Sequence, residues 1–532
     1  MSLAVVLRLG YLWTIPWHGH DLIVVDPDGY TVNGLLLSQR HFAWPALFRV
    51  VAVYQFVKPP LYTVALALVS RLPGDYPRDT AVLQALLGGA MVFAMFWIGC
   101  RLHSPRAGVA GALLGALYWP FAAGANVFIQ EALYIPLLTI AFAVLLECVA
   151  RRAPLGAWAA AGTLFGLAAL TRSMPVYYLP PALAIYVWRD RDRARAWREA
   201  GACLLAFTLL IAPYSIAISR HVHQAVVIEN MGGISFPMRY PDARQAIHHT
   251  APPPTVFETA GMLLRAFGAH PAQFAGERLG DALTLVRLRD GRSVQAVEGL
   301  RTATEARVYK TVVDTFDDGV FALVCVLAPF GWVLARHRRE SAFVGGWIVL
   351  NVLLLAIFAF TGARYRQPIV PSLMIMSGVV LAGGWTISSK AGLAAAAIAS
   401  GAVAYSIAGS VPSVLAGRAE YGLQELRTDG VTRHAQAAGE AGLNVFPADG
   451  AVTATVGLPP DLPAAEAPAR IEARINGVSL ESWTLTPGAS HGLRYLWRRS
   501  DVAYLELRAS SATGHPVAFT VDVPVGQPLH AQ

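Results

Sequence analysis

The chain contains a long series of apolar stretches, most of which have the length that a helix needs to cross a lipid bilayer. A transmembrane helix takes about 20 mostly apolar residues. Of the 532 residues, 14% are charged and 55% are hydrophobic, whereas a soluble globular domain carries about 25% charged residues. We therefore predict an α-helical polytopic membrane protein with about eleven spans. The predicted spans are residues 2–18, 79–100, 106–124, 131–150, 155–171, 174–188, 200–218, 317–335, 342–360, 367–387 and 391–410.

Basic residues cluster in the short connections between these stretches. The positive-inside rule places such clusters in the cytoplasm, and all of them fall there if the N-terminus is cytoplasmic. The net charge of +8 then needs no nucleic-acid partner. The first stretch lacks a basic leader and a small-residue cleavage site, so it is predicted to be a retained span. The clusters are Arg101 with Arg106, Arg151 with Arg152, RDRDRARAWR at 189–198, RHRR at 336–339, and Lys390.

One apolar stretch, residues 58–72, is too short for a span, since it runs for only about a dozen residues between its charges. A crossing there would also move every later basic cluster outside. It is therefore predicted to lie at the outer surface. The outer side then receives a loop at 19–78, an insert at 219–316 with helical patterns, and the C-terminal tail, while residues 1–410 form the transmembrane domain.

The C-terminal tail changes from helical to strand periodicity. Short alternating runs separated by Gly, Pro and Ser are typical of a small antiparallel β-sandwich. We predict a linker at 411–464 and an extracytoplasmic β-rich domain at 465–532. Three aromatic residues of this domain either stack on sugar rings or pack in its core: Trp483, Tyr495 and Trp497.

The four cysteines show no spacing of a metal site or of a disulfide framework. Cys100, Cys148, Cys203 and Cys325 lie in or at the ends of apolar stretches. They are predicted to pack as small apolar side chains, and no metal ligand is assigned to them.

Seven ionisable residues from distant parts of the chain are predicted to lie near the outer leaflet. Ionisable groups at membrane depth are candidates for function. Acids and bases that converge at one depth predict a site for an anionic head group with a carboxylate base. These residues are Asp26, Asp28, Lys58, Glu131, Arg172, Arg364 and Arg366.

Each of these charges also has a structural interpretation. Glu131 opens a span, where a negative side chain stabilises the helix N-terminus. Asp26 and Asp28 both precede a helix predicted to start near Tyr30, and Asp28 is in the better position for a cap, which leaves Asp26 for chemistry. A single outer arginine can extend to lipid phosphates. Several cations in the outer leaflet oppose the positive-inside bias, and a bound phosphate would stabilise them.

Five motifs follow one another along residues 1–390. In DPDGY, Asp26 stands four residues before Tyr30. KPPL begins at Lys58 and is followed by Tyr62, and a further outer acid, Glu131, opens a span. The remaining two motifs are GLAALTR, which ends at Arg172, and RYRQPIVP, which contains Arg364, Tyr365 and Arg366.

These motifs resemble those of GT-C class multi-span glycosyltransferases, in particular the branch of bacterial protein O-mannosyltransferases and lipid A aminoarabinose transferases. Many members have Asp-Glu in the first loop, where this chain has Asp26 and Pro27. The resemblance does not extend to the C-terminal β-rich region.

The resemblance implies an enzyme of the bacterial cytoplasmic (inner) membrane, with a cytoplasmic N-terminus. It would transfer a hexose or pentose from a polyprenyl-phosphate donor to a hydroxyl of a glycan, lipid or protein on the extracytoplasmic face, with inversion. No cofactor follows from it, and a divalent cation on the two acids stays open. The implied roles are catalytic for Asp26 and Glu131, donor-phosphate binding for Lys58, Arg172, Arg364 and Arg366, and supporting for Asp28, Tyr30, Tyr62 and Tyr365.

A polytopic transporter or flippase of lipid-linked sugars is the alternative from another class. Transporters are often built from internal repeats with charges at the membrane midplane. The sequence shows no convincing repeat, and its outer charges gather at one face. A polymerase or ligase for outer-surface glycans, with a diphosphate-linked donor, is a further alternative.

Overall fold

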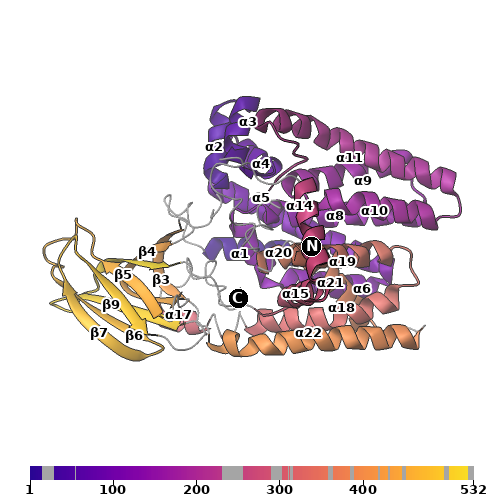
Figure 1. The fold of residues 1–532 in the computed structure, drawn as a ribbon. Coiled ribbons are helices and arrows are strands. Elements are labelled where there is room, and N and C mark those ends of the chain that lie inside the picture. The colour runs from indigo at the N-terminus through magenta and orange to yellow at the C-terminus, as the bar shows by residue number, and fades with distance from the viewer. Residues whose placement is uncertain are drawn as a thin grey trace. The chain divides into compact units, whose positions relative to one another are not determined.

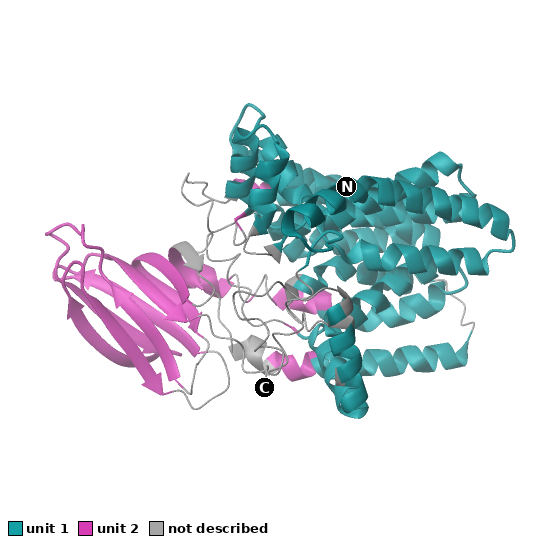
Figure 2. Ribbon diagram, turned by 45° about the horizontal axis from the view of Figure 1, so that its top comes forward, with its two compact units in different colours: residues 1–9, 30–287, 322–406 teal, residues 10–29, 288–321, 407–532 magenta. Residues whose placement is uncertain are grey.

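The computed structural model describes residues 1–14, 29–53, 56–230, 256–288, 302–308, 311, 315–357, 363–383, 389–416, 420–428, 432–445, 451–496 and 503–524. Its internal contacts divide the chain into two units (Figure 2). The helical unit comprises residues 1–9, 30–287 and 322–406, and the sheet unit comprises residues 10–29, 288–321 and 407–532.

A helix lies in every stretch that was predicted to span the membrane (Figure 1). Among the described residues, five helices are long and apolar enough to cross a membrane by length and composition: α5, α8, α11, α18 and α22. The prediction of an α-helical polytopic protein is confirmed. The helices are α1 (Ser2–Thr14), α5 (Tyr76–Leu102), α6 (Pro105–Leu117), α8 (Glu131–Arg151), α9 (Leu155–Thr171), α10 (Met174–Arg189), α11 (Arg193–Val222), α18 (Thr315–Ala335), α19 (Ser341–Ile357), α21 (Val370–Leu381) and α22 (Lys390–Ala416).

Small residues let neighbouring helices of the helical unit approach closely. A Cβ atom added to Gly162 of α9 would lie 2.0 Å from the carbonyl oxygen of Cys203 in α11. One added to Gly331 of α18 would lie 1.9 Å from the carbonyl oxygen of Met376 in α21. Because lipid tails are as apolar as leucine, helices in a bilayer associate through such close packing.

The described residues of the loop that was predicted at 19–78 form short elements. α4 is nine residues long, or about 14 Å, and is therefore much shorter than the roughly 30 Å hydrocarbon core, as expected for a segment that does not cross. The helix predicted to begin near Tyr30 is α2. The elements are α2 (Tyr30–Gln39), α3 (Trp44–Val51), β1 (Ala52–Val53), β2 (Phe56–Val57) and α4 (Leu61–Val69). The stretch 106–124, predicted as one span, is divided: α6 ends at Leu117, and α7 (Trp119–Ala123) and η2 (Gly124–Asn126) follow it.

The predicted outer insert contributes helices where its sequence shows a helical pattern. α14 (Val256–Ala269) and α15 (Pro271–Thr284) belong to the helical unit, and α17 (Ala303–Val308) belongs to the sheet unit. Pro271 occupies the first turn of α15, where its missing N–H costs no helical hydrogen bond.

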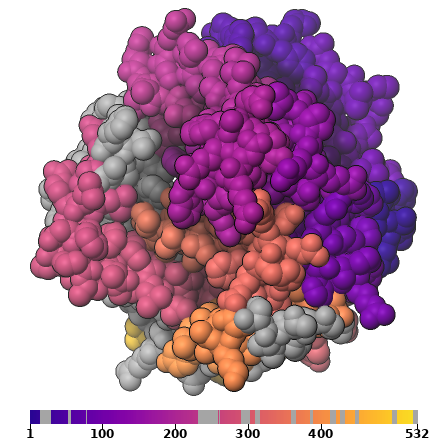
Figure 3. All heavy atoms as spheres, turned by 90° about the vertical axis from the view of Figure 1, so that its right-hand side faces the viewer, coloured from indigo at the N-terminus to yellow at the C-terminus, as the bar shows by residue number. Residues whose placement is uncertain are grey.

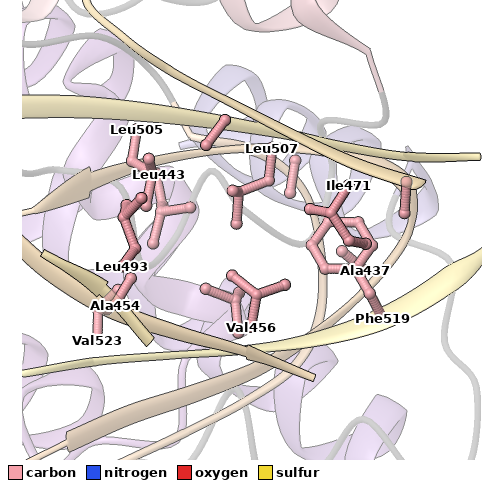
Figure 4. Packing of buried hydrophobic residues seen from close by; sticks show 14 of the residues in the cluster. Ala437, Leu443, Ala454, Val456, Ile471, Leu493, Leu505, Leu507, Phe519 and Val523 are labelled. Carbon is pink, nitrogen blue, oxygen red and sulfur yellow. The ribbon is translucent and has the colours of Figure 1, made fainter. Parts of the chain in front are cut away.

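The sheet unit contains one antiparallel sheet of eight strands. Its path is β7-β6-β9-β4-β10-β5-β8, with β3 also paired to β4. Buried and outward residues alternate along β6 and β10, so one face of each strand enters a common core. Figure 4 shows the side chains of Leu507 and Val456 pointing toward one another inside this core. The strands are β3 (Tyr421–Thr428), β4 (Thr432–Val445), β5 (Ala451–Gly457), β6 (Ala469–Ile475), β7 (Val478–Leu485), β8 (Ser490–Leu496), β9 (Ala503–Ser511) and β10 (Ala518–Pro524).

The long strand β4 joins the two halves of this sheet by changing partner at Gly439. Residues 432–438 pair with β10, whereas residues 440–445 pair with β9. Gly439 has a φ of 83°, a backbone conformation that glycine adopts without strain. The β-sandwich-like character predicted for the C-terminal region is thereby confirmed.

The boundary of this domain differs from the prediction. Three parts of the predicted linker, residues 421–428, 432–445 and 451–457, form β3, β4 and β5. Much of β4 reads as Ala, Gly and charged residues, so its sequence lacks the β-branched alternation that marks a strand. Trp483 packs against the core, and Tyr495 is 40% exposed, while Trp497 lies outside the described residues.

Replacement of Gly439 by alanine is expected to destabilise the sheet unit. The new Cβ would lie 2.5 Å from Cβ of Pro516, and a positive φ costs an L-residue about 1–2 kcal/mol. We expect a loss of about 2–4 kcal/mol in the free energy of local opening, measured by hydrogen exchange of the β4 and β10 amides in the full chain. Gly492→Ala is the control, because a Cβ there meets no atom within 4 Å. Equal protection of these amides in the two variants would contradict the conclusion that the backbone at position 439 requires glycine.

Candidate active site

Most of the predicted site residues belong to the helical unit, where they lie on five separate segments. The two acids of DPDGY, Asp26 and Asp28, lie outside the described residues. Tyr30, which follows them, is the first residue of α2 and is buried.

Tyr30 is the centre of an aromatic contact with the KPPL segment. Its ring lies 5.1 Å from the ring of Tyr62 in an edge-on arrangement. The ammonium of Lys58 lies over the same ring, 5.2 Å from its centroid, within the range of a cation–π interaction. The Tyr30 hydroxyl donates to Oε1 of Gln130 at 3.1 Å. Tyr30 therefore joins Lys58 to the residue that immediately precedes Glu131.

Glu131 and Arg172 form a buried ion pair. Nη1 of Arg172 lies 2.5 Å from Oε1 of Glu131, and the two side chains are 9% and 4% exposed. Glu131 is the first residue of α8, and Arg172 follows the last residue of α9. The Arg172 guanidinium also lies 5.2 Å from the ring centroid of Tyr365. Three predicted site residues from distant parts of the sequence are thus in contact.

A short segment after α11, residues 226–230, bonds to both cation-bearing motifs. Glu229 accepts hydrogen bonds from the backbone N–H and the hydroxyl of Ser173, the neighbour of Arg172. The Asn230 side-chain oxygen accepts from the backbone N–H of Val57, the neighbour of Lys58, at 2.9 Å. The 226–230 segment therefore fixes the main chain beside Arg172 relative to the main chain beside Lys58.

The Lys58 main chain is also fixed from α11 and α3. The Tyr214 hydroxyl donates to the Lys58 carbonyl at 3.0 Å, and the Lys58 N–H donates to the carbonyl of Val51 at 2.8 Å. Pro59 and Pro60 restrict the chain that follows. The lysine backbone is thus held at both its polar groups, which leaves the orientation of its ammonium to the side chain.

Glu229 was not predicted from the sequence. It is the only acid between Glu199 and Asp242, and it stands where an apolar helix gives way to a polar loop. This position at the end of an apolar helix is the sequence signal that could have identified Glu229. Tyr134 was also missed: its phenol is buried, interacts electrostatically with Arg172, Glu229 and Glu131, and has no hydrogen-bond partner among the described residues.

The two other predicted arginines lie in α20 (Ala363–Arg366). The side chain of Arg364 lies outside the described residues. Arg366 is 3% exposed, and its Nη1 donates to the carbonyl of Leu285 at 2.9 Å and to the carbonyl of Arg287. This contact joins α20 to the chain that follows α15.

A second arginine, Arg278, makes a similar contact from the insert to the rest of the helical unit. Nη1 of Arg278 in α15 donates to the carbonyls of Ala356 and Ile357, at 3.2 Å and 3.4 Å, at the carboxyl end of α19. Arg278 satisfies carbonyls that the end of α19 leaves without an intrahelical partner, and Arg366 bonds to carbonyls at and just beyond the end of α15. Arg366 therefore attaches the segment that carries Tyr365 to the chain after α15, and Arg278 attaches α15 to the end of α19.

The described part of the site contains two cations, Lys58 and Arg172, and two carboxylates, Glu131 and Glu229. A buried ion pair is retained when its geometry and further hydrogen bonds offset the loss of solvation. Such a cluster can bind an anionic group and orient a hydroxyl beside a fixed carboxylate. Within the described ranges no group of three or more His, Cys, Asp or Glu side chains could hold a metal ion.

Residues 57–218 match the family model of dolichyl-phosphate-mannose-protein mannosyltransferases. The resemblance to GT-C glycosyltransferases is confirmed over this segment. The match includes Lys58, Tyr62, Glu131 and Arg172. The chain is a multi-pass membrane protein. A search of curated proteins gives no significant match to the chain.

Two solved structures are similar to part of this chain. ArnT from Cupriavidus metallidurans bound to undecaprenyl phosphate is 16% identical, with a TM-score of 0.43 over 71% of this chain and 59% of that chain. The archaeal oligosaccharyltransferase AglB from Archaeoglobus fulgidus, in complex with an inhibitory peptide and a dolichol-phosphate, is 13% identical, with a TM-score of 0.43 over 76% of this chain and 53% of that chain. The match thus covers between half and three fifths of either structure.

Loss of the Glu229 carboxyl group is expected to loosen both cation-bearing motifs. Glu229→Ala leaves the Ser173 donors without their acceptor, which costs about 1–3 kcal/mol for buried groups. Hydrogen exchange at residues 56–58 and 173–176 is expected to accelerate together. Glu229→Gln keeps an acceptor oxygen and is expected to exchange as the wild type does. Acceleration at 173–176 alone would show that the 226–230 segment does not couple the two motifs.

Proposed function

We propose that the chain is a membrane glycosyltransferase that transfers a sugar from a polyprenyl-phosphate donor to an acceptor hydroxyl on the extracytoplasmic face, with inversion. The observation that carries the proposal is the Glu131–Arg172 ion pair with Lys58 held nearby through Tyr30 and Gln130. These charged residues lie in the segment that matches the mannosyltransferase family.

In this proposal the cations bind the phosphodiester of the donor. Lys58 supplies a flexible ammonium group, and Arg172 supplies a fixed guanidinium group. Arg364 of α20 is the third proposed ligand of the phosphate. An arginine fork matches the geometry of a phosphate, and lysine acts as a point charge. Arg366, also predicted as a phosphate ligand, is better suited by its carbonyl contacts to hold the insert.

Asp26 and Glu131 are proposed to act on the acceptor. The carboxylate of Asp26 takes the proton of the acceptor hydroxyl. The hydroxyl oxygen then bonds to the anomeric carbon from the side opposite the phosphate, while the bond from that carbon to the phosphate oxygen breaks. Lys58 and Arg172 stabilise the negative charge that develops on the departing polyprenyl phosphate. Glu131, fixed by Arg172, orients the reacting groups, and Tyr30, Tyr62 and Tyr365 support the two cations.

The proposed orientation in the membrane is supported by the two ends of α8. Glu131 opens this helix and Arg151 ends it 20 residues later, about 30 Å away. The basic connections at 101–106, 151–152 and 189–198 lie at the helix ends opposite the site. By the positive-inside rule we propose that these connections are cytoplasmic and that the site faces outward, in a bacterial inner membrane.

The proposal is tested with the purified full chain in lipid and a panel of polyprenyl-phosphate sugars. The wild type is expected to release free polyprenyl phosphate, and Asp26→Asn is expected to lower kcat by about 10²–10⁴-fold because the general base is lost. Asp75→Asn is the matched control, an exposed carboxylate of the same outer loop. Full turnover by Asp26→Asn would exclude Asp26 as the base. Sugar-dependent lipid movement without any turnover would favour a flippase instead.

A further inference from the structure

An apolar groove lies between α10 and α19 of the helical unit. Its volume is about 250 Å³, and its wall is formed mainly by aliphatic side chains together with Gly346 of α19. Ile185, Val349 and Leu353 line it and are each about half exposed. The groove therefore opens on the outer surface of the helix bundle, where a membrane lipid is the neighbour.

The two tyrosine hydroxyl groups in the groove are hydrogen-bonded to the protein. The hydroxyl of Tyr178 donates to the carbonyl of Phe343 at 2.7 Å, and the hydroxyl of Tyr186 donates to Oε2 of Glu199 at 2.6 Å. A wall whose polar groups are satisfied in this way offers hydrocarbon contact and no directional bond. An acyl chain fits this chemistry, because each buried CH₂ contributes about 0.8 kcal/mol.

One end of the groove carries charge. Arg189, Asp190 and Arg339 all line it. The carboxylate of Asp190 is 5% exposed and lies 3.4 Å from both Arg339 and Arg195, whereas the Arg339 side chain is 59% exposed. Arg195 and Arg339 thus pair with the buried Asp190 carboxylate. Arg195 also lies 3.5 Å from the buried Glu199, so the three arginines exceed the two carboxylates by one positive charge. The net positive mouth, with its exposed arginine heads, complements a phosphate.

This mouth is remote from the candidate active site. α10 begins at Met174, two residues after Arg172, and ends at Arg189, so its ends are about 24 Å apart. Figure 3 looks onto the end of the helical unit where the turn after α10 and the turn between α18 and α19 lie. A lipid with its phosphate at Arg189 and Arg339 cannot place that same phosphate at Arg172.

We propose that this groove is a binding site for an anionic glycerophospholipid of the leaflet opposite the candidate active site. One acyl chain lies between α10 and α19, and the phosphate contacts Arg189 and Arg339. The site does not depend on the reaction proposed above, since none of its residues belongs to the candidate active site.

Gly346 allows the groove to be filled without a clash. A Cβ atom added at Gly346 meets no atom within 4 Å, and leucine favours a helix more than glycine does. Gly346→Leu therefore places a side chain in the space of the acyl chain. Gly201→Leu is the matched control, because Gly201 of α11 also has open space and does not line the groove. Val349→Trp blocks the same groove from an exposed position and serves as the second variant.

The test measures phosphatidylglycerol bound to the purified full chain by native mass spectrometry, with phosphatidylcholine of the same chains as the zwitterionic comparison. The wild type is expected to retain one phosphatidylglycerol in preference to phosphatidylcholine. Gly346→Leu and Val349→Trp are expected to weaken its binding about tenfold through the lost chain contacts, and Gly201→Leu is expected to leave it unchanged. Arg339→Gln is expected to reduce the preference for the anionic lipid while chain binding persists.

Three results would contradict the proposal that this groove binds an anionic phospholipid. One is wild-type binding in both Gly346→Leu and Val349→Trp. Another is equal affinity for the two phospholipids. A third is stoichiometric displacement of phosphatidylglycerol by added polyprenyl phosphate, which would make the groove the place of the donor chain. Each outcome is read from bound lipid, so a failed transfer reaction leaves this test intact.

Discussion

The ion pair between Glu131 and Arg172 is the constraint on which the candidate site depends. Two charges that are nearly excluded from solvent must remain together, because removal of one partner from a buried pair costs about 3–5 kcal/mol. The pair joins the start of α8 to the end of α9. It thereby fixes a carboxylate and a guanidinium at one end of the helix bundle, and the ring of Tyr365 packs on that guanidinium.

The remaining contacts extend this fixed point to the neighbouring segments. Gln130 bonds to Tyr30, and Tyr30 contacts Lys58, so α2 and the KPPL segment are tied to the start of α8. Glu229 bonds to the neighbour of Arg172, and Asn230 bonds to the neighbour of Lys58, so the 226–230 segment connects the same two motifs by a second route. Charged groups held in this way need little reorganisation when a charge develops between them, which is the main source of electrostatic catalysis.

Much of this arrangement could be predicted from the sequence. The lengths of the apolar stretches predict the positions of the helices. The degenerate motifs alone indicate Lys58, Glu131, Arg172 and Tyr365. Other parts could not be predicted. Arg366 reads as one more outer cation, and only the fold shows that it binds carbonyls. Glu229 stands in no motif, and β4 is composed of residues with little preference for strands.

The contacts of Arg278 and Arg366 have a consequence for how the insert can vary. Both arginines bind main-chain carbonyls, and every residue type provides a carbonyl at that place. The residues at 285, 287, 356 and 357 can therefore change in side chain without loss of these bonds. The exposed side chains of the insert are therefore free to vary, while the same two guanidinium groups keep its main chain in place.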